Sequence, residues 1–225
     1  MNKALIIAAH PDDEVLGVGG TIAKLSQNEE FYILIVTEGC SSQYKDKDYK
    51  RIISEKKESS MKAAEILGAR DVLFGDLPDM RLDTVPHTEV NAVIEKALSL
   101  INPDTVFTHH YGDVNLDHRM VYNSTMVAAR PTEQSSVKKL YTYETLSSTE
   151  WQNLSTDMHF SPNTYIEIEN TLQKKIDALN AYSVELRKYP HPRSPEAIIN
   201  LARYRGQTVG VRSAEAFSLI REIIK

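Results

Sequence analysis

A compact group of potentially reactive side chains follows directly after an apolar run. The run Ala4–Ala9 reads ALIIAA, and His10, Asp12, Asp13 and Glu14 come immediately behind it. Zinc in proteins binds imidazole nitrogen and carboxylate oxygen, and a catalytic zinc has three protein ligands and one open position for water. His10 and Asp13 lie three residues apart across an expected turn, so both can face one point. The spacing predicts two ligands of a zinc site.

A second polar cluster lies far along the chain, in the segment THHYGDVNLDHR at positions 108–119. It follows another apolar stretch, so it also stands at the end of an expected strand. We expect the third zinc ligand to be His118. Asp12 would then be a spare carboxylate beside the metal, able to accept a proton from an activated water. The polar members of this cluster are His109, His110, Asp113, Asn115, Asp117 and His118.

The elements that must bring the two clusters together alternate between strands and helices. This alternation predicts an α/β fold: a Rossmann-like, mostly parallel sheet with helices on both faces. Ligands of such sheets bind beyond the carboxyl ends of the strands, where both clusters are expected. The expected strands are 4–9, 31–37, 72–74, 105–108, 139–144 and 164–169, and the expected helices are 15–25, 50–67, 89–101, 118–130, 171–187 and 214–225, with a proline-rich loop at 188–197.

Length and composition narrow the class of protein. A chain of 225 residues suits one domain spanning 1–225. The net charge of −5 argues against a nucleic-acid partner, whose binding face would be basic. With Cys40 as the single cysteine, no signal-peptide pattern and no apolar run of about 18 residues, we expect a cytoplasmic protein without a membrane segment. Whether it forms a homo-oligomer is left open.

The segment AHPDDEVLGVGG at positions 9–20 resembles the signature of the PIG-L / LmbE-like zinc-dependent N-deacetylases. Two further segments resemble the same family: KAAEILGARDVLFGDLPDMRL at 62–82 and RYRGQTVGVRSAEAF at 203–217. The resemblance covers most of the chain. It implies one Zn²⁺ per chain and a small-molecule substrate, an N-acetylglucosamine-type amino sugar or its conjugate, from which acetate is released. The carrier of the sugar stays open: free, nucleotide-, thiol-, lipid- or peptide-linked.

The resemblance also assigns roles residue by residue. His10, Asp13 and His118 match the zinc ligands of the family. Asp12 matches its general base. Asp117 matches the acid before the last histidine, which orients nearby catalytic groups in relatives.

Two departures from the family pattern concern the substrate. Asn115 stands where many relatives have a histidine; it can donate a hydrogen bond to an oxyanion but cannot titrate, so His109 or His110 is the alternative. Lys56 falls near the position of a substrate-binding arginine, and Arg51 lies about one turn away. The loops at 41–50 and 189–195 are expected to set substrate choice.

The same residues also allow other interpretations. Asp12 and Asp13 could only stabilise a helix N-terminus through its dipole. The glycines of GVGG do not form the G-x-G-x-x-G loop of a dinucleotide site, and close packing of a helix accounts for them better. The alternative functions are a metallohydrolase of another acyl amide or ester and a non-catalytic metal- or sugar-binding module. A spare carboxylate at Asp12 disfavours the module, because binding alone does not need it.

Overall fold

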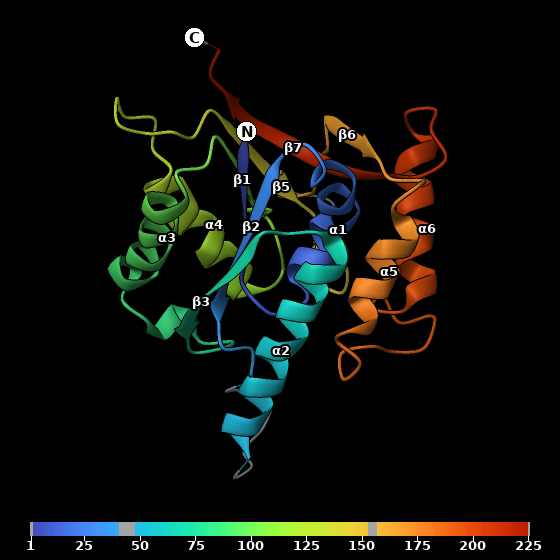
Figure 1. The fold of residues 1–225 in the computed structure, drawn as a ribbon, viewed down its shortest axis with the longest axis horizontal. Coiled ribbons are helices and arrows are strands. Elements are labelled where there is room, and N and C mark those ends of the chain that lie inside the picture. Colours follow the sequence, from blue (N-terminus) through green and yellow to red (C-terminus); the bar gives the residue numbers. More distant parts are fainter. Residues whose placement is uncertain (1, 41–47, 153–156, 225) are drawn as a thin grey trace.

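Five parallel strands form the centre of the fold, in the computed structural model that describes residues 2–40, 48–152 and 157–224. The order across the sheet is β3-β2-β1-β4-β5-β7-β6, and β7 runs antiparallel to both β5 and β6 (Figure 1). The expected α/β class with a mostly parallel sheet is confirmed. The strands are β1 (Lys3–Ala8), β2 (Glu30–Thr37), β3 (Asp71–Leu77), β4 (Thr105–His109), β5 (Lys139–Tyr143), β6 (Thr164–Glu167) and β7 (Ala214–Glu222).

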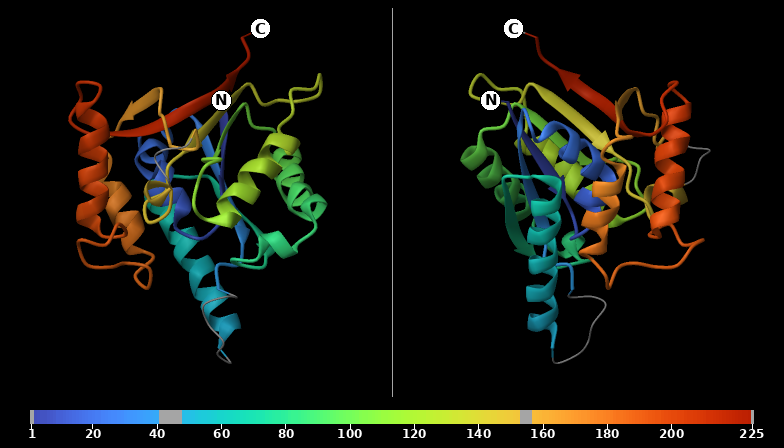
Figure 2. Two further views of the ribbon diagram at one scale, coloured as in Figure 1. Left: turned by 180° about the vertical axis from the view of Figure 1, so that it is seen from behind. Right: turned by 45° about the vertical axis from the view of Figure 1, so that its right-hand side comes forward.

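The helices cover both faces of the sheet. Helices α3 and α4 lie on one side, and α1, α2, α5 and α6 lie on the other (Figures 1 and 2). None of the described helices is long and apolar enough to cross a bilayer. The bounds are α1 (Asp13–Leu25), α2 (Tyr49–Leu67), α3 (His87–Ile101), α4 (Leu116–Ala128), α5 (Leu172–Asn180) and α6 (Pro195–Gln207), with short 3₁₀ turns η1 (Leu82–Thr84) and η2 (Thr149–Trp151).

The sequence of strand β1 is an unbroken apolar run because both faces of the strand are buried. Ile6 packs into the core under α1 and α2, whereas its neighbours Leu5 and Ile7 pack into the core under α3 and α4. All three are fully buried. A strand covered on both faces cannot alternate with polar residues. This burial fixes the point at which the chain leaves the sheet and the polar cluster begins.

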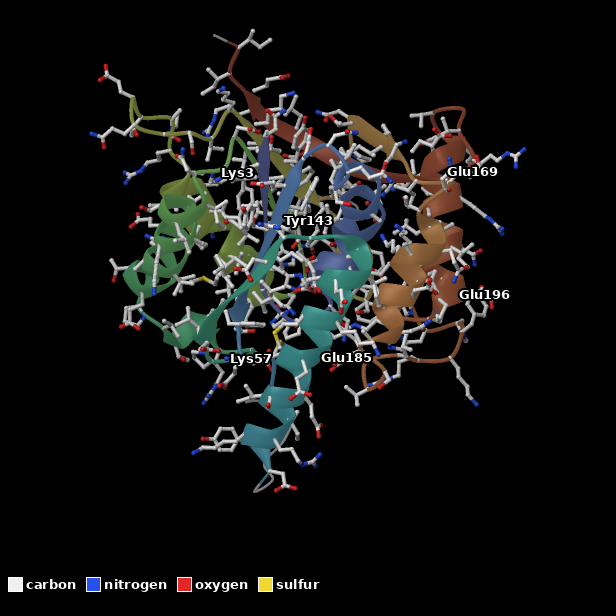
Figure 3. All side chains as sticks on the ribbon, viewed as in Figure 1. Lys3, Lys57, Tyr143, Glu169, Glu185 and Glu196 are labelled. Carbon is white, nitrogen blue, oxygen red and sulfur yellow. The ribbon has the colours of Figure 1, made fainter. Side chains whose placement is uncertain are left out.

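Helix α1 packs unusually closely on its neighbours, as its glycines predict. A Cβ atom at Gly17 would lie 2.2 Å from the ring of Tyr143, near the centre of the molecule (Figure 3). A Cβ atom at Gly20 would lie 2.7 Å from Ile168. Both positions therefore exclude any larger residue, and close packing rather than nucleotide binding explains these glycines.

A buried ion pair joins α1 to the last strand. The Glu215 carboxylate of β7 accepts hydrogen bonds from the amides of Gly20 at 2.8 Å and Thr21 at 2.7 Å. Lys175 of α5 pairs with Glu215 and donates to the Leu16 carbonyl at 2.7 Å. The Leu16 carbonyl and the Gly20 amide of α1 thus each contact a side chain of another element. The helix that carries the first polar cluster is thereby tied to the C-terminal part of the fold.

Expectations for the C-terminal part were partly wrong. Residues 214–222 form strand β7 instead of a helix, because β5 and β6 offer backbone partners on both sides. The helix expected over 171–187 ends at Asn180. Helix α6 was not expected, although Ser194 is its N-cap, accepting from the Ala197 amide at 3.1 Å, and Pro195 is its first residue.

The remaining elements agree with the sequence within a few residues. Gly68 ends α2 in the left-handed conformation, with φ 81°, as a C-cap glycine does. Of the loop expected at 41–50, residues 41–47 lie outside the described residues.

Candidate active site

The two polar clusters meet at the switch point of the sheet. Strands β1 and β4 are neighbours and parallel, and the helices that follow them, α1 and α4, lie on opposite faces. The crevice outside such a pair of carboxyl ends is the usual ligand site of an open α/β sheet. His10 enters it from the end of β1 and His118 from the first turn of α4.

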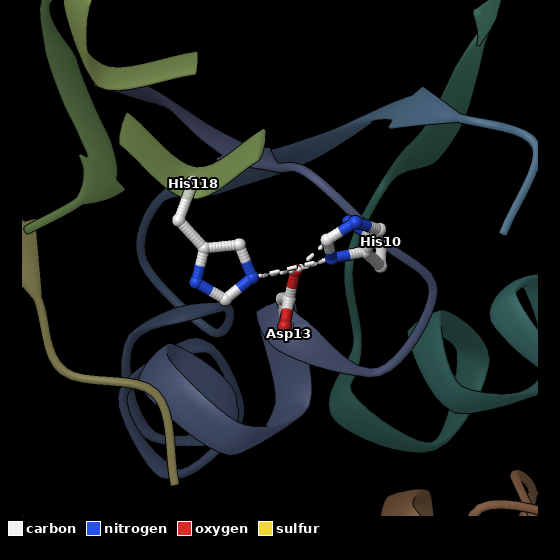
Figure 4. Close-up of side chains that lie close together, drawn as sticks. All are labelled: His10, Asp13 and His118. Carbon is white, nitrogen blue, oxygen red and sulfur yellow. Dashed lines mark hydrogen bonds and ion pairs between the residues drawn. The ribbon is translucent and has the colours of Figure 1, made fainter. Parts of the chain in front are cut away.

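Three buried side chains place one ligand atom each at the corners of a small triangle (Figure 4). His10 Nδ1 lies 3.2 Å from His118 Nε2 and 3.2 Å from Asp13 Oδ2, and His118 Nε2 lies 3.3 Å from Asp13 Oδ2. Around a tetrahedral zinc with bonds of about 2.0–2.2 Å, neighbouring ligand atoms are about 3.3–3.5 Å apart. The donor types and all three separations therefore fit a zinc ion.

Carboxylates stand behind both imidazoles. His10 Nε2 lies 3.2 Å from Asp117 Oδ2, and His118 Nδ1 lies 3.1 Å from Asp113 Oδ2. Asp117 is itself held by the Leu82 amide, which donates to its Oδ1 at 3.0 Å. Metal-binding histidines usually direct their second nitrogen to a carboxylate, which fixes the ring and strengthens it as a ligand. Asp117 thus lies where an orienting acid is expected.

A second group of possible metal ligands shares His10. Its Nε2 lies 3.4 Å from Asp79 Oδ1 as well as close to Asp117, and these three residues also satisfy the spacing of a metal site. One imidazole can serve both groups at once only if it loses both N–H protons. In its ordinary form His10 can therefore bind a metal in only one of the two groups. Asp79 and Asp117 face the nitrogen of His10 opposite to the one near Asp13 and His118.

The carboxylates of the cluster favour positive charge at the two imidazoles of the triangle. Burial lowers the pKa of His10, but hydrogen bonds with Asp117 and Asp13 outweigh it and raise that pKa to about 10. The pKa of His118 is raised to about 9, because Asp13 and Asp113 more than offset its burial. A divalent cation would supply the same charge while leaving both imidazoles neutral, which is the form that binds metal.

His109 is buried behind the triangle. Its Nε2 accepts the Ala9 amide at 2.8 Å, so the ring proton is on Nδ1, which faces Thr145 Oγ1 at 3.3 Å. Burial and the neighbouring His118 lower the pKa of His109 to about 4. His109 is therefore a neutral packing residue that supports the site from within the sheet.

Asp12 is unusual in three respects. Its φ is 104°, in the left-handed region that residues other than glycine rarely occupy. Its side chain is buried, and both carboxylate oxygens lack a hydrogen-bond partner among the described residues; its closest ionic contact is Arg193 at 3.3 Å. Burial raises its pKa to about 7 despite the opposing effect of Arg193. Asp12 precedes α1 without capping it through its side chain, so it is not simply a helix-end residue.

Glu14 holds the backbone of this turn. Its Oε2 accepts the Asp12 amide at 3.1 Å, and its Oε1 accepts the hydroxyl of Tyr182. Burial raises the pKa of Glu14 to about 8, which the Tyr182 hydrogen bond only partly offsets. Glu14 supports the strained turn that carries Asp12.

Two expected substrate contacts are engaged elsewhere. Lys56 is buried, where it pairs with Glu185 at 2.9 Å and donates to the Gly39 carbonyl. Arg51 has 62% of its side chain exposed and pairs along α2 with Glu55 at 2.6 Å. Among the contacts of the described residues, neither touches the His10–Asp13–His118 triangle. Their substrate roles stay predictions.

The candidates for oxyanion stabilisation also have internal partners. Asn115 is the N-cap of α4: its Oδ1 accepts the Asp117 amide at 2.9 Å, and its Nδ2 faces Met80 Sδ at 3.6 Å. His110 Nε2 lies 2.7 Å from the Met158 carbonyl, whereas its buried Nδ1 has no hydrogen-bond partner within the described ranges. For both residues the expected role, donation of a hydrogen bond to the oxyanion, stays a prediction.

Sequence reasoning missed Arg193, the ion-pair partner of Asp12. The residue lies in the proline-rich loop before α6, with neither a periodic pattern nor a motif around it. Only the fold brings this loop to the carboxyl end of β1. The one indirect signal was the Ser194-Pro195 pair, which is typical of a helix start and would have placed Arg193 directly before a helix.

Known proteins resemble this chain in sequence. The family described as PIG-L, GlcNAc-PI de-N-acetylase, matches residues 5–129. The uncharacterized deacetylase YaiS of Escherichia coli K12 is 30% identical over 148 residues, which cover 64% of this chain and 74% of YaiS.

Solved structures share the fold. The conserved protein TT1542 from Thermus thermophilus superimposes with a TM-score of 0.77 at 24% identity, over 100% of this chain and 97% of TT1542. The N,N'-diacetylchitobiose deacetylase from Pyrococcus horikoshii gives 0.79 at 21% identity, over 98% and 84% of the two chains. The 4-carboxy-2-hydroxymuconate hydratase GalB from Pseudomonas putida gives 0.76 at 21%, over 100% and 98%. This fold therefore carries more than one reaction.

The family match includes both polar clusters and more than half of the chain. The protein belongs to the PIG-L family of de-N-acetylases. Within that family it is an N-deacetylase with candidate metal ligands at His10, Asp13 and His118.

Proposed function

We propose that the protein is a zinc-dependent hydrolase that removes the acetyl group from an N-acetylated amino sugar or its conjugate. The observation that carries this proposal is the ligand triangle together with a second buried carboxylate, that of Asp12, directly before Asp13 in the chain; its oxygens have no hydrogen-bond partner among the described residues. The description of the matching family and the deacetylase from Pyrococcus horikoshii, which is named for an N-acetylated sugar, support the substrate class.

In this proposal His10, Asp13 and His118 hold the zinc ion. Bound there, zinc would polarise the acetyl carbonyl and lower the pKa of a water molecule. Asp12 accepts a proton from the attacking water at its carboxylate. Water oxygen bonds to the carbonyl carbon, the C–N bond breaks, and Asp12 returns the proton to the leaving nitrogen. Acetate and a free amine are the products.

The surrounding residues keep these groups in place. Asp117 and Asp113 orient the rings of His10 and His118 through the nitrogens that face away from the triangle. The buried setting of Asp12 limits its solvation, so its charge is compensated by fixed groups. We keep Asn115 and His110 as candidates to donate a hydrogen bond to the oxyanion.

The decisive experiment combines metal analysis with a substrate panel. The purified protein should contain about one zinc per chain, lose activity on treatment with a chelator and recover it on addition of Zn²⁺. Acetate release should be measured over N-acetylglucosamine in free, nucleotide-, thiol-, lipid- and peptide-linked forms. Acetate release that persists in metal-free protein would contradict the zinc assignment. A metal-loaded protein inactive on every amide and ester tested would favour a binding module.

Several broader expectations belong to the same proposal. All described strands join one sheet, which supports a single domain spanning 1–225. The single Cys40 supports a reducing, cytoplasmic setting. Size-exclusion chromatography with light scattering would show whether the protein forms a homo-oligomer.

A further inference from the structure

Arg193 reaches the candidate active site from the C-terminal part of the chain. Its Nη1 lies 3.3 Å from Asp12 Oδ2 and 3.0 Å from Glu185 Oε2, and its Nε donates to Ser147 Oγ at 2.8 Å. The guanidinium is therefore held by three separate segments: the start of α1, the loop after β5 and the loop after α5. Arg193 lies outside residues 5–129, which carry the family match.

Arg193 belongs to a row of alternating charges that ends at Asp12. Lys56 of α2 pairs with Glu185 Oε1 at 2.9 Å, and Glu185 pairs through its other oxygen with Arg193. Glu185 lies beside α2, as Figure 3 shows. Lys56, Glu185 and Asp12 are all buried. A buried row of this kind is stable only when each charge has an opposite neighbour.

The environment of Asp12 explains why it needs such a partner. A buried carboxylate without hydrogen bonds is costly when ionised. Among the described residues Asp12 forms an ion pair with Arg193 alone, and its φ of 104° shows that the backbone is held away from a relaxed conformation. Arg193 both balances the charge and fixes the direction of the carboxylate.

We propose that Arg193 is a positioning residue that holds the Asp12 carboxylate in its reactive place, with Glu185 and Lys56 fixing Arg193 in turn. This inference rests on the proposed function for its kinetic consequences. It also gives a structural reason for the burial of Lys56.

The kinetic test uses the zinc-loaded full chain and the substrate identified by acetate release. Arg193→Ala should lower kcat about 10- to 100-fold, the effect of a misplaced catalytic group, with KM and zinc content unchanged. Arg193→Lys keeps the charge without the fork, so it should lose less. Added guanidinium ion at millimolar concentration should restore part of the Arg193→Ala activity.

The matched control is Arg187→Ala. Arg187 lies on the same segment but is exposed, and within the described residues its guanidinium donates to the backbone carbonyls of Val184 and Leu186. This variant should keep wild-type kcat and should not respond to guanidinium. A rise in KM at constant kcat for Arg193→Ala would make Arg193 a substrate contact and overturn the proposal, as would activity within twofold of wild type.

A second test does not depend on activity. If Arg193 compensates Asp12, Arg193→Ala should lower the melting temperature by on the order of 5 °C in the wild-type background and by clearly less in Asp12→Asn, where no charge remains to compensate. Equal shifts in both backgrounds would overturn the pairing. This measurement stands even if no acetate release is found, so failure of the proposed function and failure of the positioning role are distinguishable.

Discussion

Residues 5–129 and residues 130–224 contribute to the site in different ways. The first region supplies every atom of the ligand triangle and repeats one pattern, a buried strand followed by a helix. The second region supplies an antiparallel edge to the sheet and sends Arg193 and Glu215 back to α1. The first region thus carries the candidate metal ligands, and the second region contacts the start of α1 and fixes it.

The difference shows how a shared core can be adapted. The parallel half contains the part that matches the family, whereas the contacts to Asp12 from outside come from a loop beyond that match. Changes in the first region should therefore abolish metal binding or chemistry. Changes in the second should alter stability and the precision of the site while metal stays bound.

The sharpest test of this contrast is removal of a ligand. His118→Ala, His10→Ala and Asp13→Ala should each lose most of the bound zinc and at least about 10³-fold in activity, because three ligands are the minimum of a catalytic site. Zinc is measured by mass spectrometry of the dialysed protein. The control is His87→Ala, an exposed histidine in the same region, which should keep its zinc. Full metal occupancy in all three ligand variants would refute the assignment.

Asp12→Asn separates chemistry from metal binding within the first region. The amide has nearly the same shape but accepts no proton, so kcat should fall about 10²- to 10⁴-fold while zinc content stays near one per chain. Acetate release and zinc analysis on the same sample decide the matter. Loss of zinc together with activity would show instead that Asp12 is a ligand.

Substitutions in the second region should mainly change the free energy of unfolding. Lys175→Met leaves the buried Glu215 carboxylate without its cationic partner. It should therefore destabilise the fold by about 3–5 kcal/mol, measured by urea unfolding. The control is Arg212→Ala, which breaks the exposed Arg212–Glu169 pair and should change stability by less than about 0.5 kcal/mol. Similar effects from both variants would mean that the buried Lys175–Glu215 pair contributes no more to stability than an exposed pair.

The smallest expected effect concerns the start of α6. Ser194→Ala removes the side-chain acceptor for the Ala197 amide and should cost about 1 kcal/mol of stability. Ser194→Asp keeps an acceptor and should retain most of it. Because Arg193 directly precedes this cap, Ser194→Ala should also reduce kcat slightly; an unchanged kcat would show that the loop is fixed without the cap.

The sequence was most informative where local pattern and fold agree. Strand β1 and the turn after it were predictable, because an unbroken apolar run requires a strand buried on both faces and the polar cluster must then lie at its end. The meeting of His10 with His118 followed from the topology of parallel strands. The ligand triangle itself could be expected, but its 3.2–3.3 Å edges required the structure.

The rest depended on contacts between distant segments. Ala214–Glu222 has apolar residues that suit a helix as well as a strand, and only the open edges of β5 and β6 decide between them. Arg193 has no local signal because its partner Asp12 is far away in the sequence. The burial of Lys56 beside Glu185 could not be predicted from helix periodicity alone, and its expected contact with substrate stays a prediction.

The two hydrogen bonds that Glu215 accepts from the amides of Gly20 and Thr21, here called the Glu215 clasp, also have a consequence for the order in which α1 and β7 become fixed during synthesis. The helix bearing Asp13 is synthesised well before strand β7, whose Glu215 carboxylate secures it. We therefore expect α1 to remain loosely held on a nascent chain until β7 has paired. Pulse-labelled amide exchange during refolding should protect Gly20 and Thr21 no earlier than the amides of β7; earlier protection would show that α1 is secured without its clasp.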